Sequence, residues 1–189
     1  MRTPQDTLPR RGPFGLWKGM SGSNIGAELT MIRPFVFIAE RVPDPHPALR
    51  TYTLAIAPRG GLGWVKAVGP FIQTGAAGLE LRSAFAALRA ELAAHYGACE
   101  TFDGPVGERL QCAPGAWMPA LLVREQHLAA VWRTGAGSRM SDALQCVVLE
   151  ARAATVSAGR LHLECHFNNG DAVDAESASW RIGRRPPPE

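Results

Sequence analysis

The sequence lacks the two kinds of segment that would direct it into or across a membrane. No stretch approaches the run of about 20 apolar residues that a membrane-spanning helix needs. Residues 1–15, MRTPQDTLPRRGPFG, contain no apolar core of the kind found in a secretory signal peptide. We therefore expect a cytoplasmic protein with no membrane partner.

Cysteine is also scarce. The 189 residues include four cysteines, too few and too widely spaced for a disulfide framework: Cys99, Cys112, Cys146 and Cys165. Apolar residues make up 46% of the chain, the share usual for a globular protein, so a core can form without disulfides or metal ions. We expect reduced thiols, as the cytoplasm maintains them.

A strong charge of one sign is missing as well. The chain has 20 Lys and Arg against 17 Asp and Glu, a formal net charge of +3. Part of the basic excess lies near the two ends, at Arg2, Arg10, Arg11, Arg181, Arg184 and Arg185. Nucleic-acid-binding domains concentrate basic residues on one element. We therefore expect no nucleic-acid partner.

No stretch carries the spacing of a nucleotide-binding loop. The glycine-rich stretches GGLG and GAAG lack the pattern G-x-x-x-x-G-K-[ST], and no lysine follows them to reach a phosphate. The stretch GSNIGAEL is not preceded by a buried strand, as a dinucleotide-binding fingerprint would be. We interpret these stretches as turns and predict neither a cofactor nor a metal ion.

Composition divides the chain into one domain with two polar ends. Residues 1–12 contain two prolines and two adjacent arginines, and residues 181–189 contain three consecutive prolines. Both ends are expected to be disordered because they have few apolar groups to bury. A single domain is predicted over residues 13–180, a usual size for one domain.

The clearest periodicity lies in residues 79–96. Their apolar residues recur at spacings of three or four and so share one face of an α-helix: Leu81, Phe85, Leu88, Leu92 and Tyr96. Ala, Glu and Arg, which favour helices, fill most other positions. Gly97 is suited to end the helix.

Six other stretches have the alternation or the β-branched and aromatic composition of strands: residues 34–42, 51–57, 62–69, 127–133, 143–155 and 160–167. A Pro-Arg-Gly-Gly turn joins the second stretch to the third, which predicts a hairpin. The proline-rich VPDPHPALR before the second stretch is expected to be a loop. Alternation in the last stretch indicates a sheet with one dry face and one solvated face.

Two short helices are also expected. Ser21 or Ser23 can cap a helix over Asn24–Leu29, and residues 171–180 are assigned to a small terminal helix. Residues 116–123 fit either a helical turn or an extended segment. Because strands occur in runs, the fold class is α+β. We expect an antiparallel sheet of about five or six strands, one long helix packed on one face, and a short N-terminal helix.

Two sets of side chains raise the question of catalysis. His162 and His166 flank Glu164 on one strand face, but they lie about 13 Å apart at the rise of a strand, too far to bind one metal ion together. Glu164 with one histidine stays an alternative to a solvated sheet face. A thiol nucleophile at Cys99 or Cys112 would need a nearby base or positive charge, which the neighbouring sequence does not supply.

The remaining histidines and cysteines have simpler interpretations. His46 lies in the proline-rich loop and His95 lies beside the apolar face of the predicted helix, so we expect both to be structural or exposed. Cys146 and Cys165 are interpreted as small apolar core residues.

An aromatic residue on a loop is a candidate for partner contact. Trp117 follows a loop rich in glycine and proline, and Arg124 and Glu125 lie nearby in the sequence. We predict that Trp117, Arg124 and Glu125 form a partner-binding patch.

The stretch FGLWKGMS resembles the opening of a group of uncharacterised proteobacterial domains with the pattern F-G-[LI]-x-x-G-M-S. The matching residues are Phe14, Gly15, Leu16, Gly19, Met20 and Ser21. Three later stretches, YTLAIAPRGGLGWVKAVG, TGAAGLELRSAFAALRAEL and WMPALLVREQHLAAVWR, follow in an order similar to that of the same group. The resemblance covers about residues 14–168 and transfers no functional residues.

Some relatives of this group look like immunity proteins, which neutralise secreted antibacterial toxins. The resemblance thus implies a protein partner, namely a toxin encoded nearby. Our first hypothesis is a non-catalytic protein-binding domain of this kind. Two alternatives stay open, a small enzyme using a cysteine or a His/Glu site, and a homodimeric regulatory module that associates through an exposed sheet edge. The sequence leaves the oligomeric state open.

Overall fold

The computed structural model describes residues 12–106, 114–135 and 138–168 of the chain. The predicted polar ends, except for residue 12, lie outside these residues, as do the predicted helix at residues 171–180 and Cys112. Within the described part, no helix is long and apolar enough to cross a membrane.

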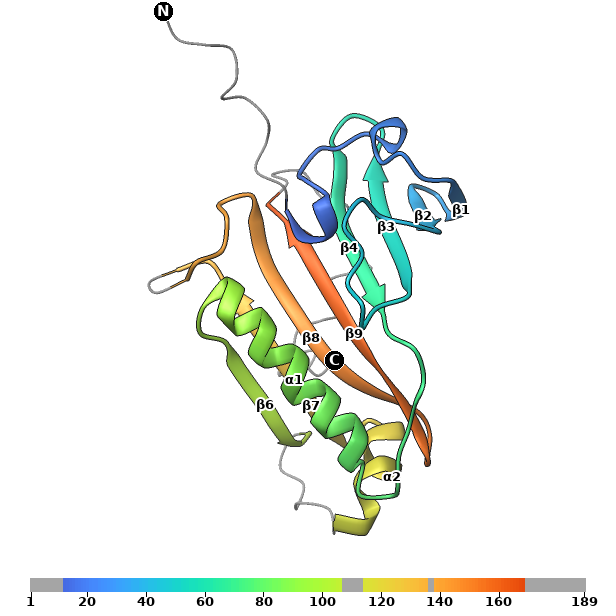
Figure 1. Cartoon of the computed structure of the whole chain (residues 1–189), viewed down its shortest axis with the longest axis vertical. Coiled ribbons are helices and arrows are strands. Elements are labelled where there is room, and N and C mark those ends of the chain that lie inside the picture. Colours follow the sequence, from blue (N-terminus) through green and yellow to red (C-terminus); the bar gives the residue numbers. More distant parts are fainter. Residues whose placement is uncertain (1–11, 107–113, 136–137, 169–189) are drawn as a thin grey trace, which may run out of the picture.

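The described chain forms one antiparallel sheet of nine strands (Figure 1). The strands are β1 (Leu29–Arg33), β2 (Val36–Ala39), β3 (Thr51–Ala57), β4 (Gly61–Val68), β5 (Ile72–Gln73), β6 (Glu100–Pro105), β7 (Gln126–Arg133), β8 (Leu144–Thr155) and β9 (Ala158–Phe167). They are arranged in the order β1-β2-β3-β4-β9-β8-β7-β6, and the short β5 also pairs with β9. The α+β class is confirmed, but the expected number of strands is too low.

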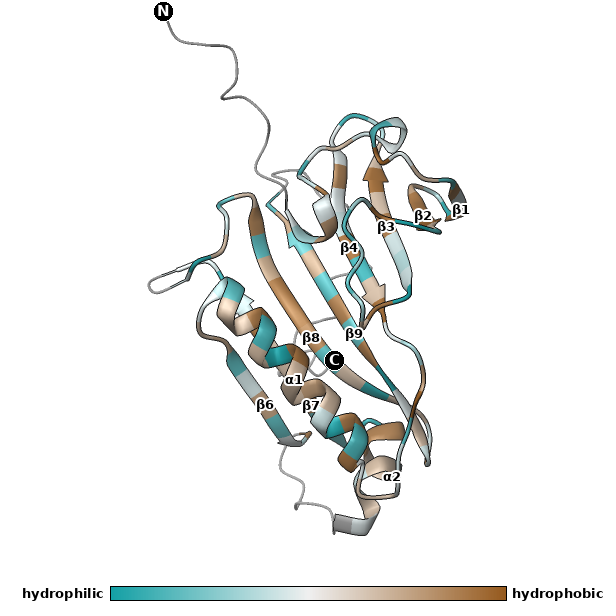
Figure 2. Cartoon of the chain, viewed as in Figure 1, coloured by the Kyte–Doolittle hydropathy of each residue, from teal (hydrophilic) through white to brown (hydrophobic). Residues whose placement is uncertain are grey.

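The predicted long helix is confirmed as α1 (Leu79–Tyr96). All five residues of its apolar stripe are buried: Leu81, Phe85, Leu88, Leu92 and Tyr96. The helix lies on one face of the sheet against β8 and β9 (Figure 1), and hydrophilic and apolar residues alternate along it (Figure 2). Gly97 ends the helix with a φ of 92°, and its N–H donates to the Ala93 carbonyl.

The short helix predicted over Asn24–Leu29 is wrong. The chain forms a 3-10 turn at Gly22–Asn24, and the Ser21 side chain makes no capping hydrogen bond to it. Gly26 has a φ of 68°, which interrupts a right-handed helix. Leu29 then begins β1 instead of ending a helix.

The strand predicted at residues 34–42 is shorter than expected and belongs to a hairpin. Pro34 and Phe35 form the turn between β1 and β2, and Arg33 pairs with Val36 across it. Cross-strand pairing to β1 therefore overrides the local sequence pattern from which a single strand is predicted.

A further correction concerns the chain between α1 and β7. No strand is predicted between Gly97 and Trp117, but this part of the chain contains β6, which pairs with β7 along its whole length. Of the two conformations left open for residues 116–123, the helical one is present as α2 (Trp117–Leu122). The strands predicted at residues 51–57, 62–69, 127–133, 143–155 and 160–167 correspond to β3, β4, β7, β8 and β9.

The stretch FGLWKGMS is built into the core. Leu16 and Met20 are buried, and the Phe14 ring packs edge-on against Tyr52 at a centroid distance of 5.1 Å. Two main-chain hydrogen bonds of 2.9 Å, from Gly19 N–H to the Leu62 carbonyl and from Leu62 N–H to the Met20 carbonyl, join this stretch to β4. The stretch therefore has a structural role.

The contact between this stretch and β4 leaves no room for a side chain at Gly61. A Cβ atom there would overlap the main chain of Gly19, and the φ of 65° is in the left-handed region. The neighbouring Gly60 has neither restriction, since the nearest atom to its Cβ would be Ala57 Cβ at 3.7 Å.

We expect Gly61→Ala to lower the free energy of unfolding by at least about 2 kcal/mol, because it combines a main-chain clash with a strained φ. Urea denaturation followed by tryptophan fluorescence measures the change. Gly60→Ala is the matched control and should change stability by less than about 0.5 kcal/mol. Equal effects of the two substitutions would contradict the close approach of Gly19 and Gly61.

Candidate functional site

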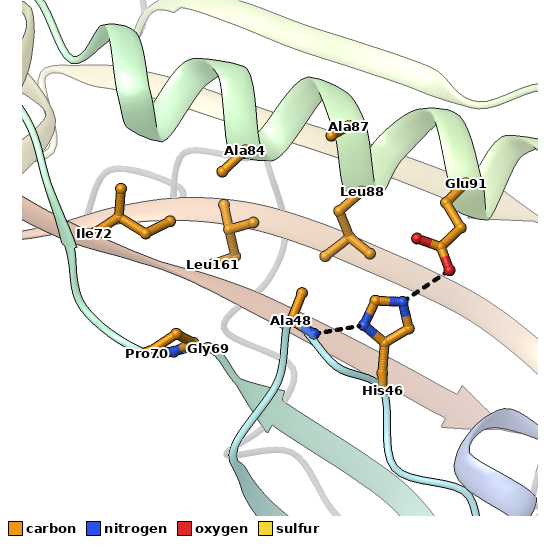
Figure 3. Close-up of a pocket in the computed structure, with 10 residues that line it drawn as sticks. All are labelled: His46, Ala48, Gly69, Pro70, Ile72, Ala84, Ala87, Leu88, Glu91 and Leu161. Carbon is orange, nitrogen blue, oxygen red and sulfur yellow. Dashed lines mark hydrogen bonds and ion pairs between the residues drawn. The ribbon is translucent and has the colours of Figure 1, made fainter.

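A cleft of about 310 Å³ opens beside α1, on the helix-bearing face of the sheet (Figure 3). Its walls come from α1, from the loop between β2 and β3, and from the connection between β4 and β5, while Leu161 of β9 forms part of its floor. The volume is at the lower end of the range of about 300 to 1,000 Å³ that is usual for ligand pockets. The cleft can therefore hold one small apolar group.

The helix supplies one wall of the cleft through a second row of residues. Ala84, Ala87, Leu88 and Glu91 are spaced at i, i+3, i+4 and i+7, so they share a face of α1 next to the buried stripe. Two of the four are alanines, and their short side chains leave the space open. Glu91 lies at the rim, with its side chain 64% exposed.

The opposite wall is held in place by His46. The imidazole Nδ1 accepts a hydrogen bond of 3.1 Å from the Ala48 main-chain N–H, and Nε2 lies 3.0 Å from Glu91 Oε1 (Figure 3). The main-chain N–H of His46 donates to the Tyr52 hydroxyl at 3.1 Å. Burial raises the pKa of Tyr52, so this hydroxyl stays protonated near neutral pH. The loop is therefore tied both to the sheet and to the helix.

These contacts fix the tautomer of His46. Since Nδ1 accepts the hydrogen bond from the Ala48 main-chain N–H, the ring proton lies on Nε2, which donates a hydrogen bond to Glu91. Both ring nitrogens are thus engaged within the protein, and neither is directed at the cleft as a free base. None of the ten residues that line the cleft is a serine, threonine, cysteine or lysine. The cleft is suited to binding an apolar group and has no arrangement for nucleophilic catalysis.

The histidines and glutamate of β9 lie on the face of the sheet opposite α1. There the carboxylate of Glu164 is buried, with Oε1 at 3.0 Å from Lys66 Nζ and Oε2 accepting a hydrogen bond of 3.3 Å from Trp64 Nε1. His166 Nε2 lies 3.7 Å from Oε2. Burial alone would raise the pKa of Glu164, but His166 and Lys66 outweigh it and lower the pKa below its usual value.

His162 is neutral in this surrounding. Burial lowers its pKa to about 3, and the positive charges of Arg152 and Lys66 act in the same direction. Its neighbour Glu150 pairs with Arg152 across a distance of 2.5 Å. The predicted solvated sheet face is therefore wrong at these positions, because this part of the face consists of buried or half-buried charges that neutralise one another.

The same contacts bear on the metal and thiol alternatives. Among the described residues, no group of three or more His, Cys, Asp or Glu side chains could hold a metal ion. Burial raises the pKa of both Cys146 and Cys165, which keeps the two thiols protonated. Cys99 is half-buried, with its sulfur 3.7 Å from the Thr101 hydroxyl.

The structure separates the three residues of the predicted partner-binding patch. The Trp117 side chain is 4% exposed and packs against Gly78, where the missing Cβ makes room for the indole ring. The guanidinium of Arg82 covers the ring at 4.9 Å from its centre. Trp117 is thus a core residue, which corrects its assignment as a surface contact, whereas Arg124 and Glu125 are exposed after α2. A partner contact at these two stays a prediction.

The cleft could not be predicted from the sequence, because His46 and Glu91, which meet at its rim, lie 45 residues apart. One signal was present in the helix, where the row of Ala84, Ala87 and Glu91 runs beside the apolar stripe. Small residues next to a buried face can indicate a neighbouring groove, but only the fold shows which loop forms its other side.

Comparisons with known proteins do not add to these observations. No protein-family model, no curated protein and no solved structure matches the chain. Any function therefore has to be inferred from the residues and geometry of this chain.

We expect Lys66→Met to lower the free energy of unfolding by about 3 kcal/mol, because it leaves the buried carboxylate of Glu164 without its closest cation. The double variant Lys66→Met with Glu164→Gln should recover most of this loss. Asp103→Asn is the control, since it removes an exposed ion pair with Arg82 and should cost less than about 1 kcal/mol. Urea denaturation at neutral pH tests all three variants. A double variant that is no more stable than Lys66→Met would contradict the pairing of Lys66 with Glu164.

The low pKa of His162 in the folded protein should make the protein less stable in acid. Its pKa is lowered from 6.5 to about 3 in the folded state, so below pH 6.5 the unfolded chain takes up a proton that the folded protein does not. The free energy of unfolding should therefore fall as the pH is lowered from 6.5. We expect His162→Gln to reduce this fall, between about pH 7 and about pH 5, by about 2 kcal/mol.

Urea denaturation at the two pH values measures the effect. The same pH dependence in wild type and His162→Gln would show that His162 does not remain neutral in the fold.

Proposed function

We propose that this protein is a non-catalytic binding domain whose cleft beside α1 receives an apolar side chain of a protein partner. The observation that carries the proposal is the cleft itself, a space of about 310 Å³ walled by the alanines of α1 and by the loop that His46 attaches to Glu91. Apolar anchors that fill preformed pockets contribute much of the affinity in protein interfaces.

The construction of the cleft supports binding without a large rearrangement. Three hydrogen bonds hold His46 and its main chain, to Ala48, Glu91 and Tyr52. A wall that is already ordered costs less conformational entropy when a partner binds. The exposed carboxylate of Glu91 lies at the rim, where it can accept a hydrogen bond from the partner and orient the bound side chain.

We further propose that the partner is a secreted antibacterial toxin and that the domain neutralises it in the cytoplasm as an immunity protein. The support for this partner class is the resemblance of the stretch FGLWKGMS and of the later segments to domains related to immunity proteins. The cleft is compatible with it, because a non-catalytic inhibitor needs a preformed surface and no reactive group.

The enzymatic alternatives have less support. Both nitrogens of His46 are engaged within the protein, and Lys66 and Trp64 contact the two carboxylate oxygens of Glu164. Neither His46 nor Glu164 is therefore free to act as a general base.

The test compares two neighbouring alanines on α1. Ala87→Trp places an indole at the cleft wall and should weaken partner binding at least about 100-fold, since it blocks the site of an anchor residue. Ala86→Trp is the matched control, because residue 86 is also exposed on α1 but does not line the cleft. The partner used is the product of the adjacent reading frame, and calorimetry measures its affinity.

Protection of growth gives the second readout. Co-expression of the wild type and of Ala86→Trp with that product should preserve growth, whereas Ala87→Trp should not. If the wild type binds and protects but Ala87→Trp does so equally well, the partner binds elsewhere and the cleft is not the site. If the wild type neither binds nor protects, the toxin-neutralising function is wrong.

A further inference from the structure

The two outer edges of the sheet differ in how they face solvent. An edge strand presents unpaired main-chain N–H and carbonyl groups, which proteins commonly protect with charged side chains or proline. β6 has this protection, with Glu100 and Asp103 along it and Pro105 at its end, and Arg82 pairs with Asp103 at 2.6 Å. β6 is therefore an edge that discourages association.

The opposite edge has such residues only at its ends, Glu28 before β1 and Arg33 followed by Pro34 after it. Among the described strands β1 pairs with β2 alone, and all of its residues after Leu29 are exposed. Met31 is 63% exposed, Ile32 is 49% exposed, and Phe35 in the hairpin turn is 50% exposed. Three large apolar side chains thus gather at one unpaired edge, an arrangement that favours addition of another strand.

Phe35 also has an unfavourable backbone conformation. Its φ of 63° lies in the left-handed region, where glycine or asparagine would be easier to accommodate after Pro34. A phenylalanine at this position strains the backbone of the turn and exposes an aromatic ring to solvent. This combination indicates that the ring has a role outside the hairpin.

We propose that β1 is the dimer interface of this protein, where the β1 strand of a second copy adds antiparallel to it around a two-fold axis near Met31. The two sheets then join into one, and Met31, Ile32 and Phe35 of each copy are covered by the other. A two-fold axis perpendicular to the sheet is the symmetry that pairs a strand with its own copy in antiparallel direction.

Charge complementarity selects a second copy as the occupant. Glu28 lies just before β1 and Arg33 ends it, and both are exposed. In an antiparallel pair, the acidic start of one strand lies beside the basic end of the other, at both ends of the interface. A parallel pair would instead place like charges together. The edge is therefore complementary to itself in one direction only.

This interface does not depend on the proposed function. β2 and β3 separate β1 from β4 in the sheet, and no residue of β1 or β2 lines the cleft. Failure of the dimer would leave the binding role of the cleft unaffected, and the reverse also holds.

The first test measures mass by sedimentation and light scattering at concentrations between about 1 and about 100 µM. We expect the full-length wild type to dimerise within this range. Phe35→Gly should weaken dimerisation at least about tenfold and, because glycine tolerates the positive φ, leave the monomer as stable as the wild type in urea denaturation. Val156→Gly is the matched control, since Val156 lies in the β8–β9 hairpin turn and is 54% exposed; it should dimerise like the wild type.

The second test reverses charges at the ends of β1. Glu28→Arg and Arg33→Glu should each weaken dimerisation about tenfold by placing like charges side by side. The double variant should restore wild-type dimerisation, because each strand again offers one acidic and one basic end to its copy.

Three results would overturn the proposal. One is a wild type that stays monomeric at about 100 µM. Another is a dimer that Phe35→Gly does not weaken. The third is a double charge variant that dimerises no better than the single variants, since an interface elsewhere, or an edge that binds a different protein, would not recover when both charges are exchanged.

Discussion

The apolar face of α1 is buried against β8 and β9, and this contact sets the rotation of the helix about its own axis. Successive residues of an α-helix are about 100° apart. With Leu81, Phe85 and Leu92 directed at the sheet, Ala84 and Ala87 must lie to one side of the contact. A helix turned by one residue would put large side chains where the alanines now leave a cleft. The shape of the binding surface therefore follows from the packing of the core.

The end of α1 shows how strongly that rotation is held. Trp132 of β7 is fully buried, donates its indole N–H to the Gly97 carbonyl at 3.1 Å, and packs near Tyr96. At the other end, Gly78 has a φ of 69° and accommodates Trp117 of α2 against its main chain. Both ends of the helix thus pack against a tryptophan beside a glycine, and these contacts hold the wall of the cleft in place.

Local periodicity made α1, the hairpin of β3 and β4, and the final strands predictable, because each pattern is contained within a few consecutive residues. The helix expected at Asn24–Leu29 failed because the left-handed φ of Gly26 and the pairing of β1 with β2 outweigh a weak helical pattern. β6 was missed because its glycine and proline are typical of loops, and only pairing with β7 makes it a strand. Trp117 was misplaced because the space that receives it belongs to Gly78, which is 39 positions earlier by residue number (117 − 78).

The two surfaces on which the proposals rest also depend on contacts between residues far apart in the sequence, and both are apolar. Glu164 and the histidines beside it are the side chains that the sequence offers as a catalytic group, yet in the fold Lys66 pairs with Glu164 and burial keeps His162 neutral. Both proposals rest on shape and exposed apolar area, at the cleft and at β1. These surfaces use different elements, so a dimer formed through β1 would leave both clefts open. Each copy could then hold its own partner, and the two partners would be linked through one continuous sheet.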